Sequence, residues 1–302
     1  MSESPYTAHV DCFARDRLPP PEQQPEFLFE LPELVFPERL NSATGLLDRR
    51  VTSGEGKRPC LRTPGGLCWT YAELQQRANR IAHVLVSDMG LVPGNRVLLR
   101  GPNTPMMVAS WFAVIKAGGI AVATMPLLRA RELGQVIEKA EVSHALCDRT
   151  LVEELSIARA AQPGLRELRS FGSGEVVGSG DSSLEAAMQR HPAHFDNVDT
   201  ARDDTCIIAF TSGTTGQPKG TMHFHHRDVM AACACWPRHV LKASADDVFI
   251  GSPPIAFTFG LGGLVLFPMS IGASTVLLPK AGPNELLDAI PACGATVLFT
   301  AP

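Results

Sequence analysis

Apolar residues along the chain fall into short continuous runs, and two stretches share one order of strands and helices. The first has strands at 97–99, 120–124 and 144–147, with helices at 106–117 and 133–140 between them. The second has strands at 248–250, 274–278 and 296–299, with helices at 259–267 and 284–292. The strands lack polar alternation, which is typical of parallel strands covered on both faces. The pattern predicts an α/β fold of two stacked, doubly wound, mostly parallel sheets with right-handed crossovers.

These patterns divide the chain into an arm at residues 1–50, a first α/β subdomain at 51–190 and a second at 191–302. Prolines and aromatic residues alternate in the arm, at Pro19-Pro20-Pro21, Phe27, Phe29 and Phe36 among others. Prolines exclude a regular helix, so we expect an extended arm that wraps over the body. The alternative is a disordered tail, but its regularly placed apolar residues would then lie in solvent.

Local sequence patterns predict the structure of three further segments: a helix, a surface loop and a long uncharged run. Thr70 followed by Glu73 is a capping box, so a helix is expected from Thr70 to near Gly90. The stretch 171–181 is rich in Gly and Ser and is expected to be a surface loop. From Gly251 to Pro279 no residue is charged. Prolines and glycines interrupt this run, which favours a buried helix and a buried strand over a membrane span.

Composition and charge narrow the possible partners. The 302 residues are 45% apolar and carry a net charge of −4, so no basic field for nucleic acid or an anionic membrane is present. Several of the eight cysteines, including Cys147, Cys206 and Cys293, lie in apolar runs and are interpreted as core thiols of a reducing compartment. Cys233 and Cys235 lack a second ligand pair for a metal. No signal peptide is recognised, and the predicted location is the cytoplasm.

The stretch with the most chemistry follows the apolar run Cys206–Phe210, which predicts a buried strand. It reads Thr211-Ser212-Gly213-Thr214-Thr215-Gly216-Gln217-Pro218-Lys219-Gly220. Glycines admit backbone N–H groups close to a phosphate, the hydroxyls donate, and Lys219 adds a point charge. Its spacing fits neither the Walker A motif nor the dinucleotide fingerprint. An ordinary turn needs no such set of hydroxyls, so the stretch predicts a loop that binds the phosphates of a nucleotide.

Thr211 to Gly220 resembles, at every position, the phosphate-binding motif of the adenylate-forming superfamily. This superfamily includes acyl-CoA synthetases, peptide-synthetase adenylation domains and firefly luciferase. The similarity continues through Met222 and His226-Arg227, and it covers nearly the whole chain. The opening from Ala8 to Asp48 resembles ligases that join benzoate or 2-aminobenzoate to coenzyme A.

The resemblance implies a two-step reaction with ATP, Mg²⁺ and coenzyme A, in which a small aromatic acid becomes an acyl adenylate and then a thioester. It implies that Lys219 and Thr214 act in catalysis. ATP would contact Thr211, Ser212, Gly213, Thr214, Thr215, Gly216, Lys219 and Gly220. The acid would contact Ala256, Phe259, Gly260 and His226. Many relatives carry His or Tyr where this chain has Phe259, so an apolar, flat acid is expected; alternatively Phe259 is a core aromatic residue at a helix start.

Two nearby histidines have other possible roles. Alternation places His223 and His225 on one face of a short strand, which could be half of a metal site. A third ligand is not evident, so pocket or packing roles are favoured over zinc, and no metal ligand is assigned. His226 is expected to open the next helix, which runs to about Cys235.

The chain ends at Pro302 directly after a predicted strand, and the family's later motifs for Mg²⁺, ribose and the mobile lysine are not in it. We therefore expect an N-terminal fragment that is inactive alone, and a homodimer is the candidate assembly of the whole protein. Alternative functions are a fatty acyl-CoA synthetase, a peptide-synthetase-type adenylation domain, a kinase or ATPase with a variant phosphate loop, or a non-catalytic binding module. Which acid is used is not fixed by the sequence.

Overall fold

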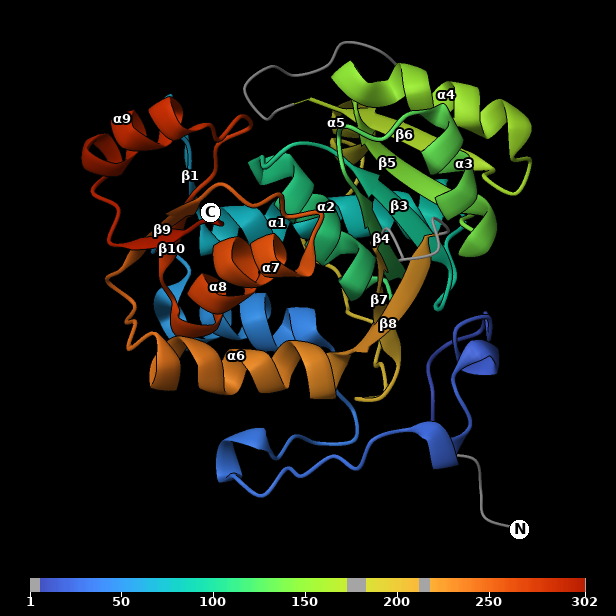
Figure 1. Cartoon of the computed structure of the whole chain (residues 1–302), viewed down its shortest axis with the longest axis horizontal. Helices are drawn as coiled ribbons and strands as arrows, with labels where there is room; N and C mark the ends of the chain where they lie inside the picture. Colours follow the sequence, from blue (N-terminus) through green and yellow to red (C-terminus); the bar gives the residue numbers. More distant parts are fainter. Residues whose placement is uncertain (1–5, 173–182, 212–217, 302) are drawn as a thin grey trace.

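The computed structural model describes residues 6–172, 183–211 and 218–301, and it places them in two sheets with helices between and outside them (Figure 1). The strands are β1 Pro59–Arg62, β2 Cys68–Thr70, β3 Arg96–Arg100, β4 Ile120–Thr124, β5 His144–Asp148, β6 Glu167–Phe171, β7 Thr205–Thr211, β8 Lys219–Phe224, β9 Val248–Gly251, β10 Ser274–Val276 and β11 Val297–Phe299. The helices are α1 Tyr71–His83, α2 Pro105–Lys116, α3 Ala130–Lys139, α4 Val152–Ala161, α5 Leu184–Met188, α6 Ala231–Cys235, α7 Thr258–Leu261, α8 Phe267–Ile271 and α9 Pro283–Cys293.

Short 3-10 and π-helical segments extend or connect several of these elements. They are η1 Arg15–Arg17, η2 Pro21–Gln23, η3 Pro32–Leu34, η4 Thr44–Asp48, η5 Val51–Glu55, η6 Val84–Asp88, η7 Arg149–Leu151, η8 His225–Met230, η9 Trp236–Val240 and η10 Gly262–Leu266. The capping box predicted at the start of α1 is confirmed, since the Thr70 hydroxyl accepts from Glu73 N at 3.2 Å and a Glu73 carboxylate oxygen accepts from Thr70 N at 2.8 Å. The helix continues through η6, and Gly90 then takes a positive φ of 69°.

Both predicted repeats are present, and they have the same strand order. In the described part of the chain, one sheet runs β6-β5-β3-β4-β7-β8 and the other runs β11-β9-β10-β1-β2. The triplets β5-β3-β4 and β11-β9-β10 are therefore equivalent, with every pair within them parallel. Antiparallel pairs occur only at one edge of each described sheet, β7 with β8 and β1 with β2. The predicted fold class, two mostly parallel α/β sheets, is confirmed.

The two sheets do not follow the expected boundary near residue 190. β1 and β2 precede it but pair into the sheet of the second repeat, whereas β7 and β8 follow it but pair into the sheet of the first. The phosphate-loop hairpin thus belongs to the six-stranded sheet. The sequence analysis predicted a strand at 206–210 and a short strand around His223 but none at β1 or β2, and the partners of all four strands are distant in sequence and leave no local signal.

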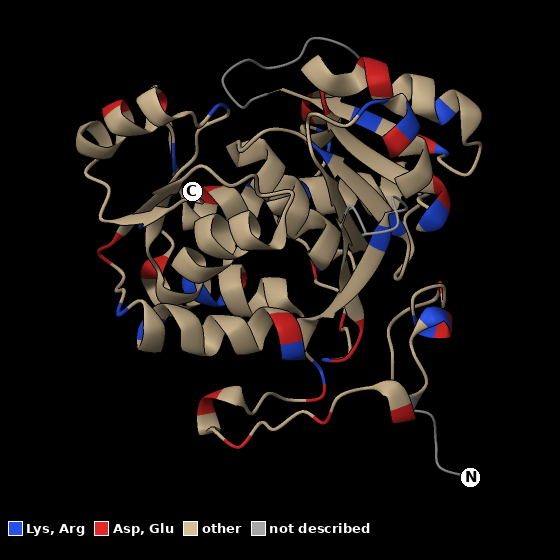
Figure 2. Ribbon diagram, viewed as in Figure 1, with Lys and Arg blue, Asp and Glu red and all other residues tan. Residues whose placement is uncertain are grey.

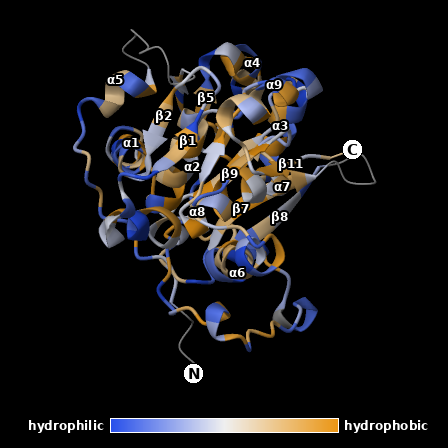
Figure 3. Ribbon diagram, turned by 90° about the vertical axis from the view of Figure 1, so that its left-hand side faces the viewer, coloured by the Kyte–Doolittle hydropathy of each residue, from blue (hydrophilic) through white to orange (hydrophobic). Residues whose placement is uncertain are grey.

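Alternate residues along the central strands face different layers of the core. Val97 and Leu99 of β3 join the cluster between the sheets, while Leu98 faces the layer of α3 and α4. In β9, Phe249 faces the central cluster and Ile250 faces α9. Since both faces are buried, the strands need no polar alternation. The hydropathy colours concentrate the apolar segments in the strands and in the helices between them (Figure 3), and charged residues lie mainly on the outer elements (Figure 2).

The uncharged run from Gly251 to Pro279 folds into α7, η10, α8 and β10. It is therefore a buried helical stretch followed by a strand, as predicted. Among the residues that the structure describes, no helix is long and apolar enough to cross a membrane. The Gly/Ser-rich stretch 171–181 falls almost wholly at residues 173–182, outside the described part.

The arm is extended with short turns as far as Asn41, which agrees with the prediction, but its expected extent to residue 50 without regular helix is wrong. Helical structure begins at residue 42 and includes η4. Proline accounts for the difference, because Pro37 is the last proline before Pro59 and nothing between them prevents a helix.

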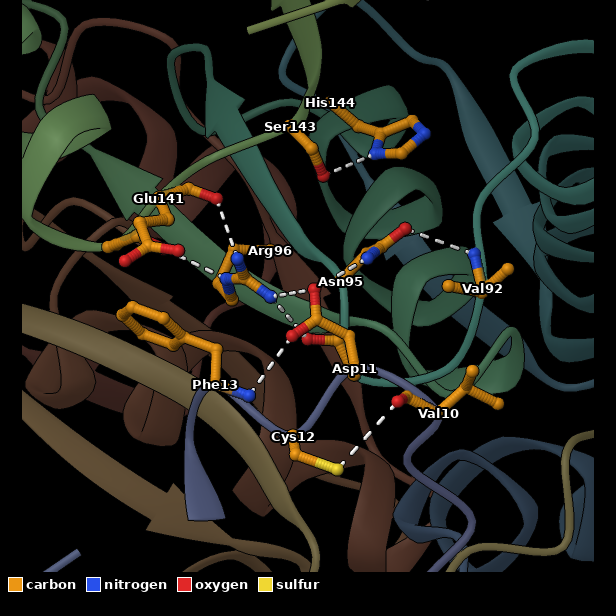
Figure 4. A network of polar contacts seen from close by, with 12 residues as sticks. Val10, Asp11, Cys12, Phe13, Val92, Asn95, Arg96, Glu141, Ser143 and His144 are labelled. Atoms are coloured by element: carbon orange, nitrogen blue, oxygen red, sulfur yellow. Dashed lines mark hydrogen bonds and ion pairs between the residues drawn. The ribbon is translucent and has the colours of Figure 1, made fainter. Parts of the chain in front are cut away.

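The arm is fastened to the body by buried polar contacts at the amino end of β3 (Figure 4). A carboxylate oxygen of Asp11 accepts hydrogen bonds from Asn95 Nδ2 at 2.9 Å and from Arg96 Nη1 at 2.5 Å. The Arg96 guanidinium also lies 4.3 Å from the centre of the Phe13 ring. Burial alone raises the pKa of Asp11, but hydrogen bonds from Phe13 N and Arg96 outweigh it and lower that pKa below its usual value. Asp11 is thus held as an anion that ties the arm down.

Candidate active site

The predicted phosphate loop connects β7 to β8, two antiparallel strands of one hairpin. Thr211, the last residue of β7, lies directly opposite Lys219, the first of β8. Both side chains belong to exposed residues at the open end of the hairpin. The intervening residues Ser212, Gly213, Thr214, Thr215, Gly216 and Gln217 lie outside the described part of the chain. The structure therefore places the two ends of the loop, with one hydroxyl and one ammonium group on them.

Gly220 follows Lys219 and pairs with Phe210 across the hairpin. A Cβ atom at this position would lie 3.0 Å from Ile208 Cγ2 and 3.3 Å from the Phe210 ring. Both contacts are tighter than ordinary van der Waals packing, so a larger residue would push against the strand that delivers the loop. This glycine therefore serves the packing of the hairpin beside Lys219.

The loop begins between two neighbouring strands, β4 and β7, whose following connections run to opposite sides of the sheet. β4 and β7 are neighbouring parallel strands, so Thr124 and Thr211 end at the same edge of the sheet. After β4 the chain passes through α3 to β5, on the far side of β3, whereas β7 leads into β8 on the opposite side. Such switch points at the carboxyl ends of parallel strands form crevices in which α/β proteins bind ligands.

A cavity of about 280 Å³ occupies this position. Its wall consists mostly of apolar side chains, with a few polar groups at the rim. The lining residues are Ala123, Thr124, Met125, Leu128, Glu132, Gln135, Val136, Phe210, Thr211, Pro218, Ala256 and Phe257. Thr211 and Pro218 belong to the hairpin, so the cavity directly adjoins the ends of the phosphate loop.

The second repeat supplies one wall of the cavity through the segment after β9. Ala256, one of the predicted acid-binding residues, lines the cavity together with Phe257, which is 44% exposed. Phe259 does not line it and instead packs against Phe299, with ring centres 5.7 Å apart. Gly260 is buried against the main chain of Pro253 and Pro254, where a side chain would overlap the Pro254 carbonyl. The aromatic residues among the described lining are therefore Phe210, from β7, and Phe257, two positions before Phe259.

His226 is not brought to this cavity. It follows Phe224, which pairs with Thr205 at the other end of the hairpin, roughly 20 Å from Thr211 at about 3.4 Å per residue. Its Nε2 lies 2.8 Å from the Leu34 carbonyl oxygen, and its ring lies 4.4 Å from that of Phe29. It lines a separate cavity of about 790 Å³ under the arm. His226 thus contacts the arm and lies away from the cavity at the phosphate loop, and its contact with the acid stays a prediction.

The cavity residues that sequence reasoning missed come from the segment after β4. Met125, Leu128, Gln135 and Val136 lie on the connection into α3 and on α3 itself. Their position after β4 could have identified them, because ligands of α/β proteins bind beside the segments that follow parallel strands at a switch point. The sequence alone did not show that β4 and β7 are neighbours.

Among the described residues, no group of three or more His, Cys, Asp or Glu side chains is arranged to hold a metal ion. His223 is the penultimate residue of β8, and its Nδ1 lies 3.3 Å from Asp228 Oδ1. His225, in contrast, starts η8 and is buried, with Nδ1 accepting from Ser42 N at 3.2 Å. All eight cysteines are free thiols; Cys147 and Cys206 are buried as predicted, and Cys293 is partly buried.

The burial of His225 leads to a pH prediction. Loss of solvation lowers its pKa from 6.5 to about 3 in the folded protein. Between these values the unfolded chain binds a proton that the folded chain excludes, so the free energy of unfolding falls as pH falls, by roughly 1.4 kcal/mol per pH unit for this group. We expect urea unfolding at pH 5 to give a value roughly 2 kcal/mol lower than at pH 7 from His225 alone. The variant His225→Gln should lose that part of the pH dependence, and parallel pH curves for the two proteins would contradict this role.

Known proteins are similar to this chain along most of its length. Residues 47–302 match the family model described as "AMP-binding enzyme". Benzoate–CoA ligase of Thauera aromatica is 30% identical over 252 residues, which are 82% of this chain and 46% of that protein. The crystal structure of the anthranilate CoA ligase AuaEII in complex with anthranoyl-AMP superposes with a TM-score of 0.81 at 26% identity and covers 87% of this chain and 50% of that one.

ATP-bound MatB from Rhodopseudomonas palustris gives a TM-score of 0.75 at 28% identity, over 86% of this chain and 49% of that one. The chain thus spans about half the length of the relatives it matches. A family model that covers most of the sequence, together with relatives similar along most of its length, establishes the membership. The chain belongs to the AMP-binding, adenylate-forming enzyme family.

Proposed function

We propose that the chain is the N-terminal part of an ATP-dependent ligase that activates a small aromatic carboxylic acid and transfers it to coenzyme A. The observation that carries the proposal is the shared edge: the described ends of the phosphate loop and an apolar cavity of about 280 Å³ both include Thr211 and Pro218. An acid held in the cavity would thus lie beside a nucleotide held by the loop. Holding two reactants together in this way is a large part of what such an enzyme must do.

The first half-reaction joins the two ligands. A carboxylate oxygen of the acid attacks the α-phosphorus of ATP, the bond to the bridging oxygen between the α- and β-phosphorus atoms breaks, and pyrophosphate leaves with the electron pair. Lys219 and Thr211, which pair at the open end of the hairpin, would bind the leaving phosphates and stabilise the charge that develops on them. Ser212, Thr214, Thr215 and the glycines Gly213 and Gly216 would complete this cradle through hydroxyl and backbone donors.

In the second half-reaction the sulfur of coenzyme A attacks the acyl carbon, forms the thioester and expels AMP. We assign none of the described residues to coenzyme A or to Mg²⁺. Mg²⁺ would offset phosphate charge when bound. The residues described here bind and orient the acid and the phosphate tail.

The cavity favours a small, flat and mainly apolar acid. Met125, Leu128, Val136 and Phe257 present apolar surface, and Glu132 is the charged residue among the described residues of the lining. The names of the similar proteins, ligases of benzoate and of anthranilate, support the aromatic class. A long acyl chain would exceed a volume of about 280 Å³ unless it left the cavity. Free thiols throughout the chain support a reducing, cytoplasmic location.

Other functions give different products. A fatty acyl-CoA synthetase or a peptide-synthetase-type adenylation domain would also release AMP and pyrophosphate, but with a different acid. A kinase or ATPase would release ADP. A binding module would turn over nothing.

The test is hydroxylamine trapping with a full-length protein that contains these 302 residues, against benzoate, 2-aminobenzoate, other aryl acids and fatty acids. We expect aromatic acids to give the highest rates. The 302-residue chain alone should fold but form acyl adenylate far more slowly, because the groups that the family resemblance assigns to Mg²⁺ and to the α-phosphate are not in it. A preference for fatty acids would contradict the proposed substrate class.

A further inference from the structure

Two polar residues at the carboxyl end of β3 are buried beside the cavity and have no role in the reaction described above. Arg100 ends the strand and is 1% exposed, and Asn103 follows it and is 5% exposed. We propose that these two residues are positioning residues that hold the two walls of the cavity and thereby set its affinity for the acid. The claimed effect on acid affinity rests on the proposed function. The claim that Arg100 and Asn103 hold the walls in place does not depend on that function.

Asn103 holds the wall that comes from the other sheet. Its Nδ2 donates to the Pro253 carbonyl oxygen at 3.0 Å, and its Oδ1 accepts from Ile255 N at 2.8 Å. Pro253 and Pro254 have no backbone N–H, so Ile255 N is the first donor in this segment that can be fastened. A neutral amide is the side chain that supplies one donor and one acceptor at once. The next two residues of the segment, Ala256 and Phe257, line the cavity.

Arg100 holds the opposite wall through main-chain oxygens. Its Nη1 donates to Met125 O at 2.8 Å, and its Nη2 donates to Pro126 O at 3.1 Å and to Leu128 O at 2.8 Å. Its Nε also lies 3.3 Å from Leu151 O. The planar guanidinium matches several carbonyls at fixed angles, which a lysine ammonium cannot reproduce. Met125 and Leu128 carry the side chains of this wall.

The two walls belong to different sheets, and β3 is what they share. The Met125–Leu128 segment follows β4 of the six-stranded sheet, and the 253–257 segment follows β9 of the five-stranded sheet. Because Arg100 and Asn103 are three residues apart, the spacing between the walls depends on one strand end. If Arg100 and Asn103 only stabilised the fold, replacing them would lower the stability of the whole protein. It would not change exchange at one cavity wall more than elsewhere.

The experiment compares Asn103→Ala, Arg100→Met and Arg100→Lys with a matched control, Tyr71→Phe, in the 302-residue chain. Tyr71 is also buried, and its hydroxyl donates to the Ala273 carbonyl oxygen at 2.7 Å, away from the cavity. Three quantities are measured: the thermal midpoint, peptide-level hydrogen exchange at 125–129 and at 251–258, and the dissociation constant for benzoate by NMR titration.

We expect Asn103→Ala, which loses two hydrogen bonds, to raise exchange about tenfold at 251–258 with little change at 125–129. Arg100→Met, which loses three hydrogen bonds to the opposite wall, should do the reverse and raise exchange at 125–129 at least about tenfold. Both should weaken benzoate binding about tenfold, and Arg100→Lys should recover only part of the loss. Tyr71→Phe should lower the thermal midpoint but leave benzoate binding within about twofold of wild type.

Two results would overturn the inference. One is uniform exchange changes in all variants, and the other is a loss of benzoate binding in Tyr71→Phe as large as that in Asn103→Ala. If the wild-type chain binds no aromatic carboxylate, the proposed acid site fails, and the exchange pattern alone decides whether Arg100 and Asn103 position the walls. A destabilised Arg100→Met that does not fold leaves Arg100→Lys and Asn103→Ala to decide.

Discussion

Replacing Lys219 by Ala in the full-length protein is expected to lower the rate of acyl-adenylate formation roughly 100-fold, the usual cost of removing one donor to developing charge. Lys219 is an exposed residue at the first position of β8, opposite Thr211 at the mouth of the loop. Its loss removes a positive charge from the site where pyrophosphate would leave and removes little packing. Stability should therefore change by less than about 0.5 kcal/mol.

The rate is followed by pyrophosphate release with ATP, Mg²⁺ and benzoate, and the fold by circular dichroism. Lys57→Ala is the matched control. Lys57 is also exposed, but it precedes β1, which is a strand of the five-stranded sheet and not of the sheet that carries the loop. An unchanged rate in Lys219→Ala, or loss of the folded state, would count against the assigned role. An equal loss of rate in the control would mean that the effect is not local to the loop.

Gly260→Ala is expected to have the largest effect on the cavity wall. An added Cβ would overlap the Pro254 carbonyl and would lie 2.8 Å from the Pro253 carbonyl oxygen. The obstacles are main-chain atoms, which cannot rotate away as a side chain can. We expect the free energy of unfolding to fall by roughly 2–3 kcal/mol and benzoate binding to weaken, because the segment that carries Ala256 and Phe257 must shift.

Urea unfolding and benzoate titration measure these two effects. Gly164→Ala provides the comparison, since no atom lies within 4 Å of a Cβ at that position. Its stability should stay within about 0.5 kcal/mol of wild type. If Gly260→Ala were as stable as Gly164→Ala and bound benzoate normally, the close contact of Gly260 with the Pro254 carbonyl would not be needed for the stability or for the acid site.

The repeat architecture was predictable because each strand is marked by its own residues. Val97-Leu98-Leu99 and Phe249-Ile250 are continuous apolar runs, and the structure confirms that neighbouring residues in them face different core layers. The capping box at Thr70 is also a local signal, and it marked the start of α1 correctly. Patterns within a few residues thus sufficed for the strands and helices of the two repeats and for the fold class, whereas β1, β2 and β6 were not predicted.

Features that depend on contacts between distant residues were not predictable in the same way. The pairing of β1 with β10 moves the first two strands into the second sheet, and no residue near Leu61 indicates Thr275 as its partner. The lining of the cavity likewise depends on distant contacts. The resemblance implied that Phe259 and His226 bind the acid, which stays a prediction, whereas Phe257 lines the cavity and His226 contacts the arm.

We propose that this chain contributes the ATP and acid sites of an adenylating enzyme for aromatic acids. The decisive experiment incubates the full-length protein with α-³²P-labelled ATP, Mg²⁺ and benzoate or 2-aminobenzoate, with and without coenzyme A, and separates the nucleotide products. We expect label in acyl-AMP when coenzyme A is absent and in AMP when it is present, and both products should depend on the aromatic acid. Label in ADP, or AMP formation that does not depend on an aromatic acid, would contradict this proposal.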